Sequence, residues 1–331
     1  MTHIALDEKI LSVLRHNVSS YISGEDLCRT ADVSRAAIWK HIEKLRDEGY
    51  SIEASPHLGY RLLGVPDSLI PSEIKWKLKA KVLGKEVISY KKVGSTNDIA
   101  YELAEKGLKE GSVILAEEQD GGKGRHGRSW LSPSKGGIYL SVILRPQITP
   151  NEIPKITLLA AVATAKAVRD VTGLSAMIKW PNDILVRGKK ICGILTEMKA
   201  EQDSVGFIVI GIGINVNTSI KQLPKGASSL KEELRSCGRE ECVSRLDLVK
   251  RLIERLEEDY FLLKKEGFRP IMDEWKQLTD MLGSRVRVVL QNRTFEALAH
   301  DIDPDGALVV RKDAGTLERI SSGDIIMIRH G

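Results

Sequence analysis

The first 64 residues carry three short helical patterns of apolar positions, followed by two stretches in which apolar and polar residues alternate. An apolar stripe over 10–14 marks the first helix, Ser23 opens the second, and Ser34 caps the third. The alternating stretches 50–54 and 60–63 flank a turn and predict a two-stranded wing. This order of elements predicts an N-terminal winged helix-turn-helix domain over residues 1–64.

The third predicted helix has one apolar and one polar face. Ile38, Ile42 and Leu45 share the apolar face, which turns the opposite face outward. Residues 1–64 hold eight Lys and Arg against nine Asp and Glu, so only the outward face is basic, as a helix that enters a DNA groove requires. The residues that we expect to contact DNA are Ser34, Arg35, Ala36, Lys40 and Lys44. A winged helix that binds a protein partner stays open, and Trp39 fits either the core or the surface.

From residue 65 to about 280, strand patterns alternate with helical ones. The clearest helices are 157–170 and 246–263. The strand candidates are 113–116, 138–144, 176–179, 190–197 and 206–211. This segment therefore predicts a central mixed α/β domain over residues 65–280.

The last segment, residues 281–331, changes to short alternating stretches such as Arg285–Val289 and 307–311, with a tight turn at 303–306. About fifty residues of short strands predict a small β-barrel. The whole chain is then an α+β multidomain protein.

Composition limits the class of protein. A chain of 331 residues with 42% apolar and 29% charged residues is typical of a globular protein with two or three domains. The sequence shows neither a long apolar run nor a basic-then-apolar leader, so we expect a cytoplasmic protein with no membrane partner. Its four cysteines lack C-x-x-C spacing, which favours reduced thiols over a structural zinc site. The net charge of +5 is too small to identify a partner.

The segment from Gly121 to Trp130, GGKGRHGRSW, joins four glycines to three Lys and Arg residues and ends in a tryptophan. Glycine permits positive φ and a close approach of the backbone to a ligand, and Lys123, Arg125 and Arg128 supply charge-assisted hydrogen bonds. Trp130 offers a flat face for a base. The segment predicts a site for an anionic ligand.

Three other interpretations of this loop are weaker. The GxGxxG spacing of dinucleotide-binding proteins and the P-loop pattern both require a helix directly after the glycines, whereas Pro133 and the glycines at 136–137 indicate a loop. A solvated basic loop leaves the glycines and the tryptophan unexplained.

Three further polar clusters lie among the predicted strands. Ser95-Thr96-Asn97 follows a glycine and opens a helix, so its side chains serve either as a cap or as ligand donors. The segment 179–183, KWPND, places a cation, an amide and a carboxylate at a strand end, where proline stops the ladder. Lys190 begins the next strand, and 211–217, GIGINVN, ends another with small residues that permit close approach of a ligand.

Taken together and in this order, these motifs resemble those of the biotin protein ligase family, and the resemblance spans nearly the whole chain. The resemblance implies a class II synthetase-like central domain, an SH3-like C-terminal barrel and the activity of a biotin–[acetyl-CoA-carboxylase] ligase. Such enzymes join biotin to ATP, forming biotinyl-5′-AMP and pyrophosphate, and pass the biotinyl group to a lysine of biotin carboxyl carrier protein. Catalysis then rests on positioning and charge stabilisation, with Mg²⁺ held mainly by ATP and no metal site of the protein's own.

The resemblance also assigns roles to residues of this chain. Arg125, Lys190 and Asp183 would be catalytic, Asp183 by orienting or deprotonating the acceptor amine unless its role is structural. Trp130 would stack on adenine. The biotin-binding residues would be Ser95, Thr96, Asn97, Gln119, Lys123, Gly124, Arg125, Lys190, Gly211 and Gly213. The ATP-binding residues would be Arg128, Trp130, Lys179, Asn182 and Asn215.

With the winged helix in front, the chain resembles the bifunctional members of the family, which also repress biotin genes. The resemblance implies a homodimer that forms when biotinyl-AMP orders the glycine loop and the segment 218–229, and that binds operator DNA at two half-sites. Lys123 and His126 replace arginines that are common in the family's glycine loop, which puts bidentate contacts there in doubt. A transcription factor that only senses biotin and a lipoate ligase stay open as alternatives.

Overall fold

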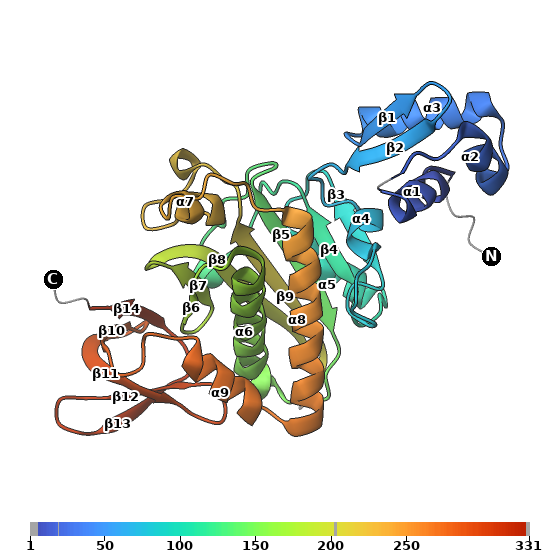
Figure 1. Ribbon diagram of the computed structural model, residues 1–331. Helices are drawn as coiled ribbons and strands as arrows, with labels where there is room; N and C mark the ends of the chain where they lie inside the picture. Colours follow the sequence, from blue (N-terminus) through green and yellow to red (C-terminus); the bar gives the residue numbers. More distant parts are fainter. Residues whose placement is uncertain (1–5, 19, 202–203, 329–331) are drawn as a thin grey trace. The chain divides into compact units, whose positions relative to one another are not determined.

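The structure is a computed structural model that describes residues 6–18, 20–201 and 204–328 (Figure 1). The chain divides into two compact units, Met1–Ser68 and Leu69–Gly331. The predicted division of the second unit at residues 280 and 281 stays a proposal, because its central and C-terminal strands share one hydrophobic core.

The first unit is a winged helix-turn-helix, as predicted. Its core is formed by apolar residues of all three helices, among them Leu14, Leu27 and Ile42, and by Leu62 of the wing. The Ser23 and Ser34 side chains accept hydrogen bonds from backbone N–H groups in the first turns of the second and third helices. The elements are α1 (Leu6–His16), α2 (Gly24–Ala31), α3 (Arg35–Asp47), β1 (Ser51–Ser55) and β2 (Gly59–Gly64).

A seven-stranded mixed sheet forms the centre of the second unit. Its strand order is β3-β4-β5-β9-β8-β7-β6, in which only the β3–β4 pair is parallel. The sequence predicts five of these strands but misses β3 and β7. The strands are β3 (Val87–Tyr90), β4 (Val113–Ala116), β5 (Gly137–Leu144), β6 (Ala176–Lys179), β7 (Asp183–Val186), β8 (Lys189–Glu201) and β9 (Ser204–Asn215).

Helices cover both faces of this sheet (Figure 1). Val113 and Leu115 of β4 point into the main core with α6 and α8, whereas Ile114 points to the opposite face, where α5 packs. No helix in the described part of the chain combines the length and the apolar character needed to cross a bilayer. The helices are α4 (Pro71–Lys75), α5 (Thr96–Glu105), α6 (Ile153–Thr172), α7 (Leu230–Arg235), α8 (Arg245–Glu266) and α9 (Arg269–Gln277), with 3-10 turns at Arg125–Gly127, Pro150–Glu152 and Ile220–Gln222.

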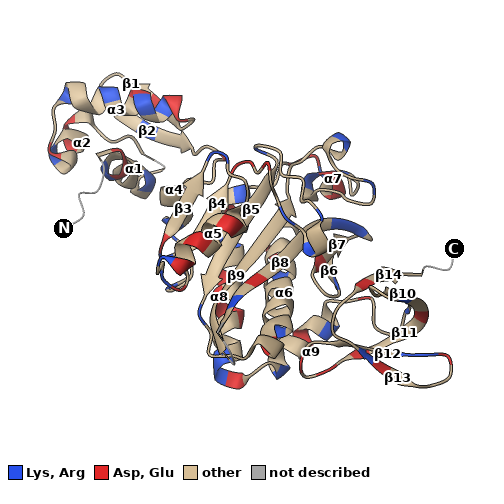
Figure 2. Ribbon diagram, turned by 180° about the vertical axis from the view of Figure 1, so that it is seen from behind, with Lys and Arg blue, Asp and Glu red and all other residues tan. Residues whose placement is uncertain are grey.

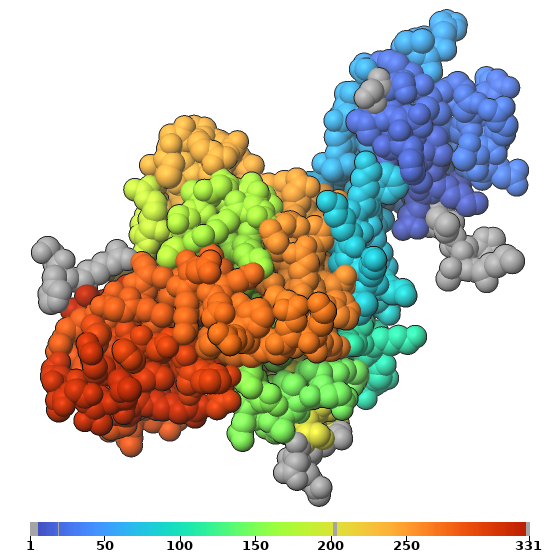
Figure 3. Space-filling view, turned by 60° about the horizontal axis from the view of Figure 1, so that its bottom comes forward, coloured from blue at the N-terminus to red at the C-terminus, as the bar shows by residue number. Residues whose placement is uncertain are grey.

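The C-terminal segment is an antiparallel five-stranded sheet in the order β13-β12-β11-β10-β14. It packs against the central domain, and the space-filling view shows its residues in red against the orange residues of α9 (Figure 3). The Trp180 indole N–H donates to the Gly306 carbonyl at 3.1 Å, which ties the 303–306 turn to the end of β6. The strands are β10 (Arg285–Val289), β11 (Thr294–Ile302), β12 (Leu308–Arg311), β13 (Leu317–Ile320) and β14 (Asp324–Met327).

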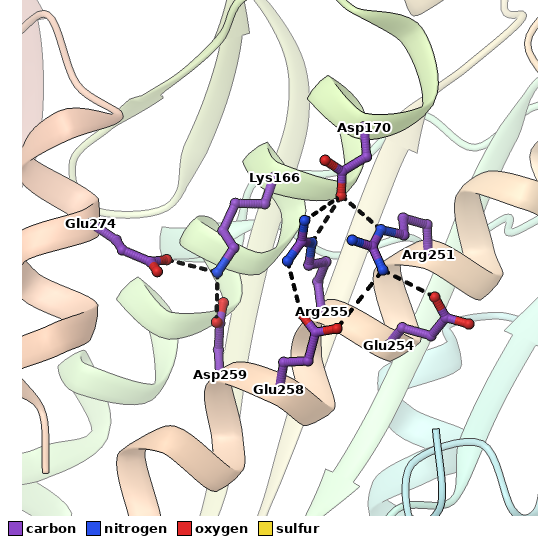
Figure 4. A network of polar contacts seen from close by, with 8 residues as sticks. All are labelled: Lys166, Asp170, Arg251, Glu254, Arg255, Glu258, Asp259 and Glu274. Carbon is purple, nitrogen blue, oxygen red and sulfur yellow. Dashed lines mark hydrogen bonds and ion pairs between the residues drawn. The ribbon is translucent and has the colours of Figure 1, made fainter. Parts of the chain in front are cut away.

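An ion-pair network joins α6 to α8 and α9 (Figure 4). The Lys166 ammonium lies 2.8 Å from Asp259 and 2.7 Å from Glu274. Burial raises the pKa of Asp259 to about 6, although the hydrogen bond from Lys166 acts in the opposite direction. At Asp170, burial also acts to raise the pKa, but hydrogen bonds from Arg255 and Arg251 outweigh it and the pKa lies below its usual value. The two carboxylates therefore respond to pH in opposite senses.

The raised pKa of Asp259 predicts a pH-dependent loss of stability. Between the unfolded pKa of 3.8 and the folded pKa of about 6, Asp259 is protonated in the folded state but not in the unfolded state. The stabilisation that comes from this proton is therefore complete below pH 4 and is lost as the pH rises through 6. Because of Asp259, the free energy of unfolding should fall by about 1 to 3 kcal/mol over that range, and this fall should be absent in Asp259→Asn. Unfolding midpoints measured from pH 4 to 7 test this. Asp170→Asn is the control and should instead cost stability above pH 4; equal pH profiles for Asp259→Asn and the unsubstituted protein would contradict the assignment.

Candidate functional site

A cleft of about 120 Å³ lies where the glycine loop, the start of α5, the β6–β7 hairpin and β14 meet over strands β8 and β9. Segments from residues 95 to 324 contribute to it, so the fold gathers motifs that are far apart in the sequence. The cleft is lined by Ser95, Thr96, Asn97, Gln119, Lys123, Gly124, Arg125, Arg128, Ser129, Trp130, Tyr139, Asn182, Asp183, Lys190, Gly193, Ile194, Leu195, Gly211, Ile212, Gly213 and Asp324.

The glycine loop is a hairpin-like turn. The Gly124 N–H donates to the Arg128 carbonyl at 2.6 Å, and the Trp130 N–H donates to the Gly122 carbonyl at 2.8 Å. Gly127 adopts a φ of +72°, a region that glycine enters without strain. The chain then continues to β5 without an intervening helix. The absence of a helix after the glycines confirms that this loop is neither a dinucleotide-binding fingerprint nor a P-loop.

The three cations of the loop each contact an oxygen of another segment. Lys123 pairs with Asp98, and Arg128 pairs with Asp324 of β14. Arg125 is the most buried of the three: its guanidinium lies 3.3 Å from both the Asn182 side-chain oxygen and the Gly323 carbonyl. Burial lowers the pKa of Arg125, while Asp324 and Asp183 oppose this effect.

The Ser95-Thr96-Asn97 cluster lies at the start of α5 and is buried. Ser95 occupies the N-cap position, but its side chain makes no capping hydrogen bond and instead lines the cleft. Gln119 accepts hydrogen bonds from the Thr96 N–H at 2.8 Å and from its hydroxyl at 3.1 Å. The Asn97 amide donates to Glu197 at 2.6 Å. Ser95 thus keeps its hydroxyl available for a ligand, while Asn97 is held by the protein.

Gly211 and Gly213 of β9 make room for protein side chains. A Cβ at Gly211 would lie 2.1 Å from the Asn97 side-chain oxygen. A Cβ at Gly213 would lie 2.4 Å from the Trp130 indole nitrogen. Trp130 is therefore partly buried over the sheet. Its role towards adenine stays a prediction.

The segment 179–183 forms the turn of the β6–β7 hairpin, as its proline predicts. Asp183 accepts an ion pair from Lys190 of β8 at 2.7 Å. The Lys190 ammonium also lies 5.4 Å from the centroid of the Trp130 ring, within range of a cation–π interaction. This arrangement places one carboxylate and one ammonium side by side on the floor of the cleft.

Two of the residues predicted to bind ATP do not line this cleft. Lys179 lines an adjoining groove. Asn215 is buried, and its amide donates to the Ser228 carbonyl at 3.1 Å. Their contact with a nucleotide stays a prediction.

Sequence reasoning misses several residues that line the cleft, among them Gly193 and Asp324. Gly193 of β8 lies under Trp130, since a Cβ there would be 3.0 Å from the indole ring. A glycine inside a strand pattern indicates that a ligand or another segment approaches the strand closely, so the sequence does carry a signal for Gly193. Asp324 contributes a carboxylate from the C-terminal sheet, and no local pattern distinguishes it.

The third helix, α3, has the predicted faces: Ile38, Ile42 and Leu45 are buried, and Ala36 and Lys40 are exposed. Figure 2 shows Lys and Arg along it, with acidic residues in its C-terminal half. Trp39 is 60% exposed, so it belongs to the surface and not to the core.

The cations of α3 differ in how free they are. Lys44 lies 2.5 Å from Asp7 of α1. Burial acts to raise the pKa of Asp7, but hydrogen bonds from Lys44 and His41 outweigh this effect, and the pKa lies below its usual value. Arg35 lies 3.8 Å from Glu25. Lys40 is therefore the exposed cation of the outward face that is least engaged by the ion pairs of the described residues.

Comparison with known proteins agrees with this geometry. Residues 90–215 match the model of the biotin/lipoate A/B protein ligase family, residues 7–61 match a helix-turn-helix domain, and residues 281–327 match the C-terminal domain of biotin protein ligases. The chain is 38% identical over 320 residues to the bifunctional ligase/repressor BirA of Bacillus subtilis, which covers 97% of this chain and 98% of that protein. It is 30% identical over 324 residues to BirA of Escherichia coli, covering 96% and 95%.

A solved structure, the biotin protein ligase of Aquifex aeolicus in complex with biotin and ATP, is also similar. It has a TM-score of 0.61 and 25% identity, and the match covers 74% of this chain and 100% of that one. The near-complete coverage by the two bifunctional relatives includes the winged helix as well as the central and C-terminal domains. The chain therefore belongs to the biotin protein ligase family, as one of its bifunctional ligase–repressors.

Proposed function

We propose that the cleft binds biotin and ATP, forms biotinyl-5′-AMP and pyrophosphate, and then transfers the biotinyl group to a lysine of biotin carboxyl carrier protein. The observation that carries this proposal is the convergence of Arg125, Arg128 and Lys190 on one cleft that also holds the carboxylate of Asp183. The Aquifex aeolicus relative is described in complex with both biotin and ATP. A site of this charge suits the meeting of a carboxylate with a polyphosphate.

The residues of the cleft divide by position. Ser95, Thr96 and Gln119 form the polar end, where hydroxyl and amide groups suit the neutral, hydrogen-bonding ring of biotin. Arg125 and Lys190 face the reacting carboxylate and the phosphate. Arg128 and Asn182 lie on the nucleotide side. Asn97 supports this arrangement through its bonds to Glu197 and Ser141.

In the first step, an oxygen of the biotin carboxylate attacks the α-phosphorus and pyrophosphate leaves. Lys190 would stabilise the charge that develops on the phosphoryl oxygens, and Arg125 would hold the biotinyl-AMP that forms. Asp183 and Asp324 are both paired with cations of the protein. The cleft therefore fits an Mg²⁺ ion that is held mainly by the phosphates of ATP and not by these carboxylates. Such an ion would neutralise phosphate charge.

One assay tests the ligase proposal. The purified protein is incubated with ATP, Mg²⁺ and a carrier domain, and with either biotin or lipoate. We expect biotin-dependent pyrophosphate release and labelling of the carrier lysine, with lipoate inactive. Labelling by lipoate, or failure to label with biotin, would contradict the proposal.

We predict that Asp183→Asn slows transfer from preformed biotinyl-AMP to the carrier by about 100-fold, because an amide cannot accept the proton of the attacking amine. Transfer is measured in a single turnover from pH 6 to 9. The control is pyrophosphate-dependent breakdown of biotinyl-AMP by the same variant, which needs no base and should change less. Unchanged transfer would leave Asp183 with a structural role only.

The winged helix would bring the protein to operator DNA of biotin genes as a homodimer that forms when biotinyl-AMP is bound. The exposed Ala36 and Lys40 of α3 support a groove-facing surface. The segment 218–229 is hydrogen-bonded to the backbone of Lys190 and to the Asn215 side chain. A ligand that contacts Lys190 in the cleft would therefore help to order this segment. We also place this protein in the cytoplasm.

Two lysines of α3 should contribute unequally to DNA binding. Lys40→Ala should weaken operator binding and reduce the slope of log affinity against log salt by about 1, because one phosphate contact is lost. Lys44→Ala should have a smaller effect, since Lys44 is held by Asp7. Binding is measured between about 50 and 200 mM salt in the presence of biotinyl-AMP, because the loss of phosphate contacts changes the affinity strongly over this range. An effect of Lys44→Ala as large as that of Lys40→Ala would contradict this difference.

A further inference from the structure

A second groove adjoins the cleft and shares Asp183 and Lys190 with it. Its other walls are the end of β6, which carries Lys179, the turn at 224–227, which carries Lys225, and β14 of the C-terminal sheet. The shared residues make the groove a continuation of the cleft on the side of Lys190 and Asp183.

The charge of this groove is unbalanced. Three lysines line it, and its one carboxylate, Asp183, is already paired with Lys190 at 2.7 Å. Lys179 and Lys225 have no ion-pair partner among the residues that the structure describes. Cations gathered beside a cleft without counterions create a positive potential that attracts a polyanion.

The turn that carries Lys225 is fixed to the cleft. The Lys190 N–H donates to the Gly226 carbonyl at 3.0 Å, and the Ser228 N–H donates to the Lys190 carbonyl at 2.9 Å. The Asn215 amide holds the Ser228 carbonyl from the other side at 3.1 Å. Lys225 is therefore positioned by the backbone of Lys190 itself, although its own side chain is exposed.

We propose, on the basis of the function proposed above, that Lys225 and Lys179 bind the β- and γ-phosphates of ATP and the pyrophosphate formed from them. When the biotin carboxylate bonds to the α-phosphorus, the bond from that phosphorus to the bridging oxygen breaks, and its electron pair leaves with pyrophosphate. The groove receives this leaving group on the far side of Lys190. Lys225 is then a phosphate-binding residue that acts in adenylation and not in transfer.

The two half-reactions separate this role from the alternatives. Preformed biotinyl-AMP is mixed either with inorganic pyrophosphate, which regenerates ATP and biotin, or with the carrier domain, which accepts the biotinyl group. For Lys225→Ala, we expect the pyrophosphate concentration at half-maximal rate to rise about tenfold, as the loss of one charge-assisted hydrogen bond implies. Transfer to the carrier should stay within twofold of the unsubstituted protein. Lys225→Arg should restore most of the pyrophosphate affinity.

Lys221→Ala is the matched control, since it removes an exposed lysine of the same segment that does not line the groove. An equal effect of Lys221→Ala, an unchanged response to pyrophosphate, or a selective loss of transfer would each overturn the proposal; the last would assign the groove to the acceptor protein. If the unsubstituted protein neither breaks down nor transfers biotinyl-AMP, the proposed function itself fails, which is a different result.

Discussion

Lys190→Met should lower the rate of adenylation by about 10² to 10³, the usual effect of removing one preorganised charge from a developing oxyanion. The Lys190 ammonium lies in the cleft beside Asp183 at 2.7 Å and over the ring of Trp130, where its position is fixed on two sides. Methionine keeps the length of the side chain but not the charge. The rate is measured as the first turnover of biotin-dependent pyrophosphate release.

The loss of Lys190 also leaves Asp183 without its partner, and a double substitution separates the two effects. If Lys190 only neutralised Asp183, Lys190→Met combined with Asp183→Asn would recover most of the activity. We expect no recovery, because the phosphate charge still lacks its ammonium. Recovery to within tenfold of the unsubstituted protein would contradict a direct role.

Arg125→Gly should retain adenylation but release biotinyl-AMP about 10 to 100 times faster, because a charged hydrogen bond contributes about 1.5 to 3 kcal/mol to holding a ligand. Arg125 is the most buried cation of the glycine loop and connects it to Asn182 and the Gly323 carbonyl. Its loss frees the loop as well as removing a contact to the adenylate. Release is measured by trapping biotinyl-AMP that leaves the protein after one turnover.

The neighbouring residue provides the control for this substitution. His126 lies in the same loop, is exposed, and adopts a φ of +56°, so glycine fits its backbone without strain. His126→Gly adds similar flexibility without removing the guanidinium and should hold the adenylate nearly as long as the unsubstituted protein. Equal release by both variants would mean that loop flexibility, and not Arg125, controls retention.

The sequence predicts the winged helix, the mixed α/β centre and the C-terminal β unit because each has its own period of apolar positions. It also predicts that the glycine loop and residues 179–183 belong to a site, since packing alone does not require glycines beside arginines or a carboxylate after proline. The strands β3 and β7, of four residues each, escape prediction, although β4 and β6, which are equally short, are predicted. Four residues hardly separate a strand from a loop.

Contacts between distant segments are the part that the sequence does not contain. Asp324 reaches Arg128 across 196 positions of the chain, and its neighbours predict only a strand. Similarly, Asn215 belongs to a motif that suggests a ligand, yet its amide donates to the Ser228 carbonyl. Local spacing identifies which side chains are unusual, whereas the fold decides whether each faces the cleft or supports a neighbour.

The central claim is that the glycine loop closes over biotinyl-AMP, with Arg125 and Lys190 on its phosphate, and excludes water until the acceptor lysine arrives. The most direct test is a crystal structure of the protein bound to a non-hydrolysable analogue of biotinyl-AMP. The account predicts the loop 121–130 folded over the analogue, with both cations within hydrogen-bond distance of the group that replaces the phosphate. A loop that points into solvent, with neither cation near the analogue, would contradict it.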